Sequence, residues 1–121
     1  VDVPALVAAA AGSAWRGMPA GTVIGHVHLH VGDLDRAASF YADGLGFDRM
    51  TWSYPGALFL GAGGYHHHLG TNTWSGPNAQ APAADEARLI AWTIELRSRE
   101  ALQRVAEQLT RAGHAVATPR E

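Results

Sequence analysis

The segment from Val23 to Val31, with the sequence VIGHVHLHV, alternates strictly between two kinds of side chain. One parity holds His26, His28 and His30 together with Ile24, whereas the other holds Val23, Val27, Leu29 and Val31. A hydrophobic period of two predicts a β-strand. Three imidazoles are therefore expected on one face, with neighbours about 7 Å apart along the strand.

The sequence that follows at once, from Gly32 to Phe47, changes to a helical period. Asp33 is a favourable N-cap residue. Apolar side chains then recur at the spacing i, i+3, i+4 and i+7, at Leu34, Ala37, Ala38 and Tyr41. This spacing predicts an amphipathic helix, which we expect Gly44 to end in the left-handed conformation.

Three more strands are predicted over residues 48–54, 57–63 and 65–74. Turns are expected between them at Pro55-Gly56 and at Gly63-Gly64, because Gly and Pro favour tight turns. The first block therefore reads β-α-β-β-β. Residues 1–21 precede it as a short helix and a connector.

A shorter version of the same pattern follows a Pro- and Ala-rich linker at residues 75–87. Residues 88–96 read as a strand, Ser98 as a helix cap, Gly113 as a helix end, and residues 114–118 as another strand. The predicted organisation is a first module at 22–74, the linker, and a partial second module at 88–121, in one domain from 22 to 121. The repeat predicts an α+β fold with a curled mixed or antiparallel sheet and helices on its outer face.

Composition excludes several classes of protein. The formal net charge is −2, which leaves no electrostatic basis for binding nucleic acid or an anionic membrane. The chain has no cysteine, so disulfides and zinc-thiolate sites are excluded. The N-terminal apolar run is too short for a membrane span and lacks a basic signal region. We expect a cytoplasmic protein, and both ends look like cuts within a longer one.

A second group of histidines lies in GGYHHHLGTNTW, residues 63–74. If this segment is a strand, His66 and His68 share a face with Asn72, and His67 points the other way. Imidazoles from two neighbouring strands can converge on Fe, Mn, Zn or Cu. The alternative is a solvated polar face with no ligand. The HVH stretch and His68-x-x-x-Asn72 also resemble the two halves of the cupin pattern, but a helix is predicted where a cupin needs its carboxylate.

The stretch GHVHLHVGDLDRAASFYADGLGF resembles the opening of a vicinal-oxygen-chelate module, the fold of glyoxalase I, extradiol dioxygenases and bleomycin-resistance proteins. The triple-histidine stretch is similar to the C-terminal half of bacterial catechol-2,3-dioxygenase-like proteins. The resemblance extends from Trp15 to Thr118. It implies paired βαβββ modules whose curled half-barrel sheets enclose a cup, with the second module incomplete here.

The resemblance also implies a metal site. A metal ligand is expected at His26, and another on the fourth strand, where parity favours His68 with His66 behind it. Residues 88–96, which would supply a third ligand, contain no histidine, and the strand that normally supplies a closing Glu is absent. The metal implied is Fe(II), with Mn(II) or Zn(II) as alternatives, and the site can be empty because two imidazoles bind weakly. His28 and His30 are the candidates for acid–base catalysis.

Three functions compete at this point. The first is a metal-dependent dioxygenase that cleaves a catechol-type aromatic ring in the extradiol manner. The second is a non-catalytic module that sequesters a small aromatic or an antibiotic, and the third is a mainly structural half of a longer enzyme. In each case we expect a homo-oligomer or pairing with a missing half.

Overall fold

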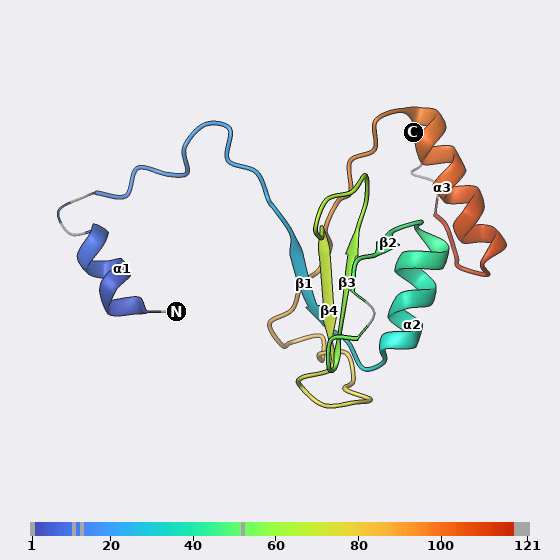
Figure 1. Cartoon of the computed structure of the whole chain (residues 1–121), viewed down its shortest axis with the longest axis horizontal. Helices are drawn as coiled ribbons and strands as arrows, with labels where there is room; N and C mark the ends of the chain where they lie inside the picture. Colours follow the sequence, from blue (N-terminus) through green and yellow to red (C-terminus); the bar gives the residue numbers. More distant parts are fainter. Residues whose placement is uncertain (1, 11, 13, 52, 118–121) are drawn as a thin grey trace.

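The computed structural model describes residues 2–10, 12, 14–51 and 53–117 (Figure 1). Its elements follow in chain order: α1 (Val3–Ala10), β1 (Val27–His30), α2 (Leu34–Ala38), the π-helical η1 (Ser39–Gly44), β2 (Asp48–Arg49), β3 (Ala57–Gly61), β4 (Leu69–Asn72) and α3 (Arg99–Arg111). The predicted α+β class is confirmed. The order β-α-β-β-β of the first block is confirmed as well.

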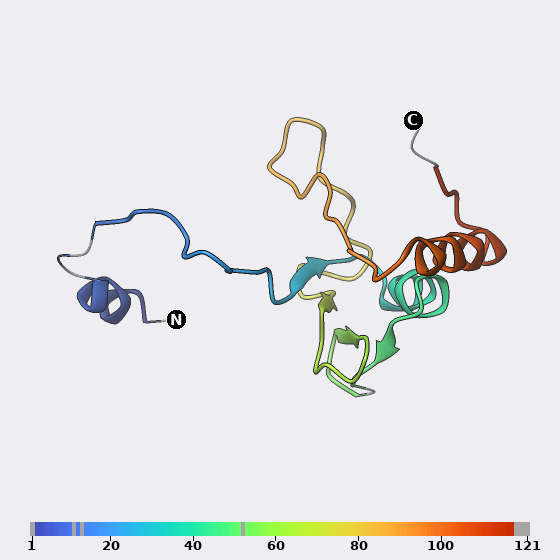
Figure 2. The same ribbon diagram turned by 90° about the horizontal axis from the view of Figure 1, so that it is seen from above.

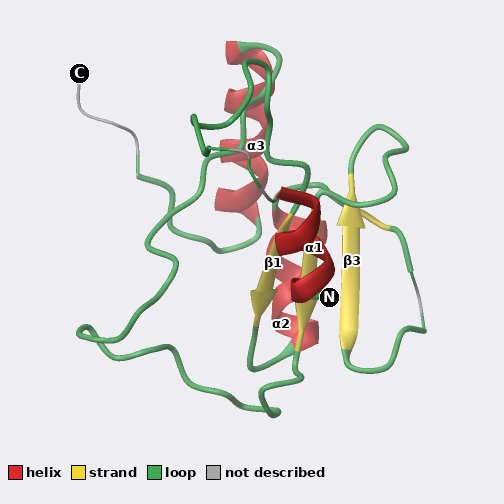
Figure 3. Cartoon of the chain, turned by 90° about the vertical axis from the view of Figure 1, so that its left-hand side faces the viewer, coloured by secondary structure: helices red, strands yellow, loops and turns green. Residues whose placement is uncertain are grey.

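The described strands form one mixed sheet in the order β1-β4-β3-β2 (Figure 3). β1 pairs with β4 in parallel, and the other two pairs are antiparallel. The sheet is open, with β1 at one edge and β2 at the other. This arrangement agrees with a curled half-barrel.

Helix α2 packs on one face of the sheet, and α3 packs against the η1 turn that continues α2. The Asp33 carboxylate caps α2 by accepting hydrogen bonds from the backbone N–H groups of Asp35 and Arg36, at 2.8 and 3.0 Å. Figure 2 shows α3 lying beside α2, and the side-chain amide of Gln108 donates to the backbone carbonyl of Asp43 at 2.8 Å. The two helices therefore form a single outer layer.

The core lies between the sheet and this layer. It is built on Ala38, Leu58, Leu60 and Leu69, with Val27 and Leu29 packed against it. The apolar parity of β1 therefore faces the helices, as the alternation predicted, and its histidines face the opposite, open side.

The end of the α2–η1 helix differs from the prediction. The left-handed glycine is Gly46, with φ of 83°, and not Gly44. Gly44 is buried, and a Cβ there would lie 3.0 Å from the Leu109 side chain. Gly44 thus permits close packing of α3 and is the last residue of η1, whereas the left-handed glycine follows two residues later.

Several predicted strands are shorter or missing. Within residues 48–54 the strand β2 covers only Asp48–Arg49, although the Met50 N–H also donates to the Phe59 carbonyl of β3 at 2.8 Å, and Trp52 lies outside the described residues. Residues 65–68 precede β4 without being strand, and residues 88–96 and 114–117 have no regular structure, with Thr118 outside the description. A strand forms only where its backbone pairs with a neighbouring strand, and residues 65–67, 88–96 and 114–117 make no such pairing in the described chain.

The helices predicted near the two ends of the chain are both confirmed. Ser98 caps α3, because its hydroxyl oxygen accepts from the Ala101 N–H at 3.2 Å, and Gly113 follows its end with φ of 84°. Helix α1 lies apart from the sheet at the end of an extended connector (Figure 1). None of the described helices combines the length and the hydrophobicity needed to cross a bilayer.

Candidate functional site

The open face of the sheet presents one row of side chains across three strands. His28 of β1 is paired in register with Gly70 of β4, and Gly70 is paired with Phe59 of β3. The rings of His28 and Phe59 lie 6.1 Å apart across the glycine. Because Gly70 has no side chain, the His28 imidazole lies over it, and a Cβ there would be 3.0 Å from the His28 Nδ1 atom.

Aromatic rings extend this row at the end of β4. The Trp74 ring lies 5.6 Å from His28, and Tyr54 lies 5.5 Å from Phe59 and 6.4 Å from Trp74. Tyr54 and Trp74 are both more than half exposed. These rings can therefore stack on a flat aromatic ligand.

The triple-histidine segment reaches the same face through His67. The His67 ring lies 4.8 Å from His26 and 5.0 Å from Phe59, measured between ring centroids. The prediction that His67 points away from His26 is therefore wrong. The prediction extended the strand alternation back to residue 65, whereas the strand β4 begins only at Leu69.

His68 has different neighbours. Its Nδ1 accepts a hydrogen bond from the Ala62 backbone N–H at 3.2 Å, and its ring lies 4.6 Å from Tyr65 and 6.4 Å from Phe47. His66 packs on Tyr65 at 4.2 Å. The structure thus brings His26 together with His67, and gives His68 a place at the β2 side of the sheet.

His28 and His30 both have polar partners. The Nε2 atom of His28 lies 2.6 Å from the Asn72 side-chain amide, and the Nδ1 atom of His30 lies 2.7 Å from the Ser75 hydroxyl. Asn72 is fully buried beneath the open face. Sequence reasoning placed Asn72 on the histidine face but gave it no role, because its partner becomes evident only from the strand register.

Burial and charge repulsion disfavour the protonated form of one histidine on this face. Burial lowers the pKa of the His67 imidazole below its ordinary value of 6.5, and the neighbouring imidazoles lower this pKa further: His66, His26, His28 and His68. A neutral imidazole is the form that binds a metal. The cluster therefore favours the ligating form of His67.

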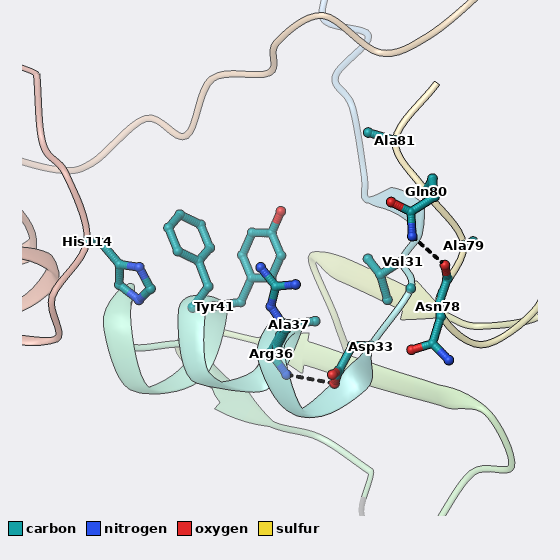
Figure 4. Close-up of a pocket in the computed structure, with 12 residues that line it drawn as sticks. Val31, Asp33, Arg36, Ala37, Tyr41, Asn78, Ala79, Gln80, Ala81 and His114 are labelled. Atoms are coloured by element: carbon teal, nitrogen blue, oxygen red, sulfur yellow. Dashed lines mark hydrogen bonds between the residues drawn. The ribbon is translucent and has the colours of Figure 1, made fainter. Parts of the chain in front are cut away.

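A separate hollow of about 560 Å³ lies on the helix side of the sheet (Figure 4). It runs between α2 and residues 78–81, with Arg36, Tyr41 and His114 in its wall. It is wide open and contains none of the histidines of the open face. The histidines of the open face therefore lie on the other face of the sheet from this hollow.

The family model of the Glyoxalase/Bleomycin resistance protein/Dioxygenase superfamily matches residues 23–121. The chain belongs to this superfamily. It is also 42% identical over 118 residues to the catechol-2,3-dioxygenase of Bacillus subtilis (strain 168). That match covers 96% of this chain, and the chain spans 41% of the relative's length. No solved structure matches the chain significantly.

Superfamily membership and this relative suggest a divalent metal, and the residues of the open face fit it in part. Two imidazole ligands of one ion hold their rings roughly 5 Å apart, because each ring nitrogen lies about 2 Å from the metal. The spacing of His26 and His67 agrees with this. Among the described residues, however, no group of three His, Cys, Asp or Glu side chains is arranged to hold a metal.

Proposed function

We propose that this chain is the metal-binding part of a dioxygenase that cleaves a catechol-type aromatic ring in the extradiol manner. The observation that carries the proposal is the meeting of His26 and His67 on an open face walled by Phe59, Tyr54 and Trp74. The similarity to a catechol-2,3-dioxygenase over nearly the whole chain supports it.

In this proposal His26 is a metal ligand from β1, and a second ligand comes from the triple-histidine segment. The placement of His67 favours it over His66 and His68, which the sequence favoured. Bound Fe(II), or Mn(II) or Zn(II) in its place, would supply the Lewis-acid chemistry that brings a substrate's two vicinal oxygens and dioxygen together. The remaining ligands would come from a paired half.

The other groups of the face serve the substrate. The aromatic walls hold the flat ring by stacking. His28 and His30 are the groups that hold or move a proton at the substrate oxygens. We further propose a cytoplasmic location, and a partner that is either a second copy or the remaining part of a longer protein.

Metal binding tests this assignment. Fe(II) titrations under anaerobic conditions should give binding to the wild-type chain together with its partner half, and catechol consumption should follow. His26→Ala should weaken Fe(II) binding by more than the roughly 10–100-fold that loss of a hydrogen-bond partner of a ligand brings. Unchanged Fe(II) affinity in His26→Ala would overturn the proposal.

Separate alanine variants of His66, His67 and His68 identify the second ligand. We expect His67→Ala to weaken Fe(II) binding most, because its ring is the one placed beside His26. His68→Ala should have a smaller effect, since its ring faces Tyr65 and Phe47. The opposite ranking would return the ligand role to His68.

A binding module without catalysis is the second candidate. The observation in its favour is the exposed aromatic pair Tyr54 and Trp74, which can hold a flat ligand with no metal. Catechol binding to the metal-free protein, together with no turnover in the metal-loaded paired form, would favour this candidate.

A further inference from the structure

The His28 ring is held in a fixed position across β4. Its register partner is Gly70, and a Cβ at Gly70 would lie only 3.0 Å from the His28 Nδ1 atom. The imidazole therefore occupies the space that a side chain at position 70 would fill. Its far nitrogen, Nε2, reaches the Asn72 amide, 2.6 Å away.

The orientation of the Asn72 amide is determined by a second hydrogen bond. Its Oδ1 accepts from the backbone N–H of Trp74 at 3.0 Å. A backbone N–H can only donate, so the oxygen of the amide must face Trp74 and the NH₂ group must face His28. Asn72 is 1% exposed, which leaves water no room to replace either partner.

We infer that Asn72 is a positioning residue that fixes His28 as the neutral tautomer protonated on Nδ1. Because the Asn72 NH₂ group donates, Nε2 of His28 must accept and therefore carries no proton. The single ring proton is then on Nδ1, the nitrogen that lies over Gly70.

The catalytic consequence rests on the proposed function, whereas the tautomer does not. With Nε2 occupied by Asn72, His28 can address a ligand on the open face only as a hydrogen-bond donor through Nδ1–H. The ligand atom that it recognises would be an acceptor, such as a phenolate, carbonyl or carboxylate oxygen. Asn72 thus selects for an oxygen-bearing ligand without touching it.

Histidine-ring NMR of the metal-free chain tests this inference. With ¹⁵N-labelled histidine at pH 8.5, long-range ¹H–¹⁵N spectra distinguish a protonated from an unprotonated ring nitrogen, and His28→Gln assigns the signals. We expect His28 to have a protonated Nδ1 and an unprotonated Nε2. A proton on Nε2, or an even mixture of tautomers, would overturn the inference.

Asn72→Asp is the decisive variant, because it keeps the oxygen that accepts from Trp74 and replaces the NH₂ group with an accepting oxygen. The proton should move to Nε2, which changes the tautomer ratio by about tenfold or more. Asn78→Asp makes the same chemical change at an exposed site and should change nothing. A folded Asn72→Asp chain that keeps the Nδ1–H tautomer would contradict the role of Asn72.

If Asn72→Asp does not fold, Asn72→Ser replaces it, since a hydroxyl can donate or accept and should give a mixture of tautomers. The wild-type spectrum alone also decides the tautomer. Neither measurement involves metal or turnover, so a failure of the dioxygenase assignment would appear separately.

Discussion

At the scale of single residues, His67 makes the stability of the fold depend on pH. Burial and then the neighbouring imidazoles lower the pKa of His67 below 6.5. The folded chain therefore binds this proton less tightly than the unfolded chain. His67 contributes stability above about pH 6.5, and this contribution is lost as the pH falls through its lower folded pKa.

Ring titration of His67 by NMR in the presence of a chelator should show a midpoint below 6.5. His66→Gln removes the largest of the neighbouring charges but not the burial, so it should raise the His67 midpoint only part of the way. A His67 midpoint at or above 6.5 in the wild-type chain would show that the cluster does not disfavour its protonation.

The alternation of β1 was enough to predict the open-face positions of its histidines, because a buried face specifies parity strongly. The same counting failed at His67, since it assumed strand geometry four residues before β4 begins. The contact between Asn72 and His28 joins residues 44 apart in the chain. No local pattern contains such a contact, because it depends on how β1 and β4 pair.

At the scale of elements, β3 and β4 hold the sheet to its helices. Leu60 is fully buried in the core, so Leu60→Ala should lower the free energy of unfolding by about 2–5 kcal/mol. Leu6→Ala makes the same change on the exposed face of α1 and should stay within about 0.5 kcal/mol of wild type. Urea unfolding measures both, and equal effects would mean that this sheet does not contain the main core.

Elements with local signals were predicted well. The caps Asp33 and Ser98 mark the starts of α2 and α3, because capping involves only a few neighbouring residues. The π-helical turn was not predicted, and its last residue, Gly44, lies against Leu109 of α3 in a contact between elements that no local pattern contains. The strand expected at 88–96 has the right composition, but pairing requires an edge from elsewhere.

At the scale of the whole molecule, the described chain leaves apolar side chains without cover. Four of them come from one segment: Leu89, Ile90, Ile94 and Leu96, which are 37–78% exposed. Trp92, between them, packs against the core and anchors the segment to the domain. β1 is at the same time an edge strand of the described sheet. An apolar segment and an open edge together favour association.

We therefore predict that the chain self-associates in the absence of a partner half, and that residues 88–96 take part. Sedimentation should show dimers or larger species whose fraction rises with concentration. Ile90→Lys should shift the chain toward monomer, because a buried ammonium group in the contact is strongly unfavourable. Val7→Lys places the same charge on the exposed face of α1 and should leave the association unchanged.

A wild-type chain that stays monomeric at high concentration would contradict the prediction. Equal loss of association in both variants would show that the contact is not specific to residues 88–96.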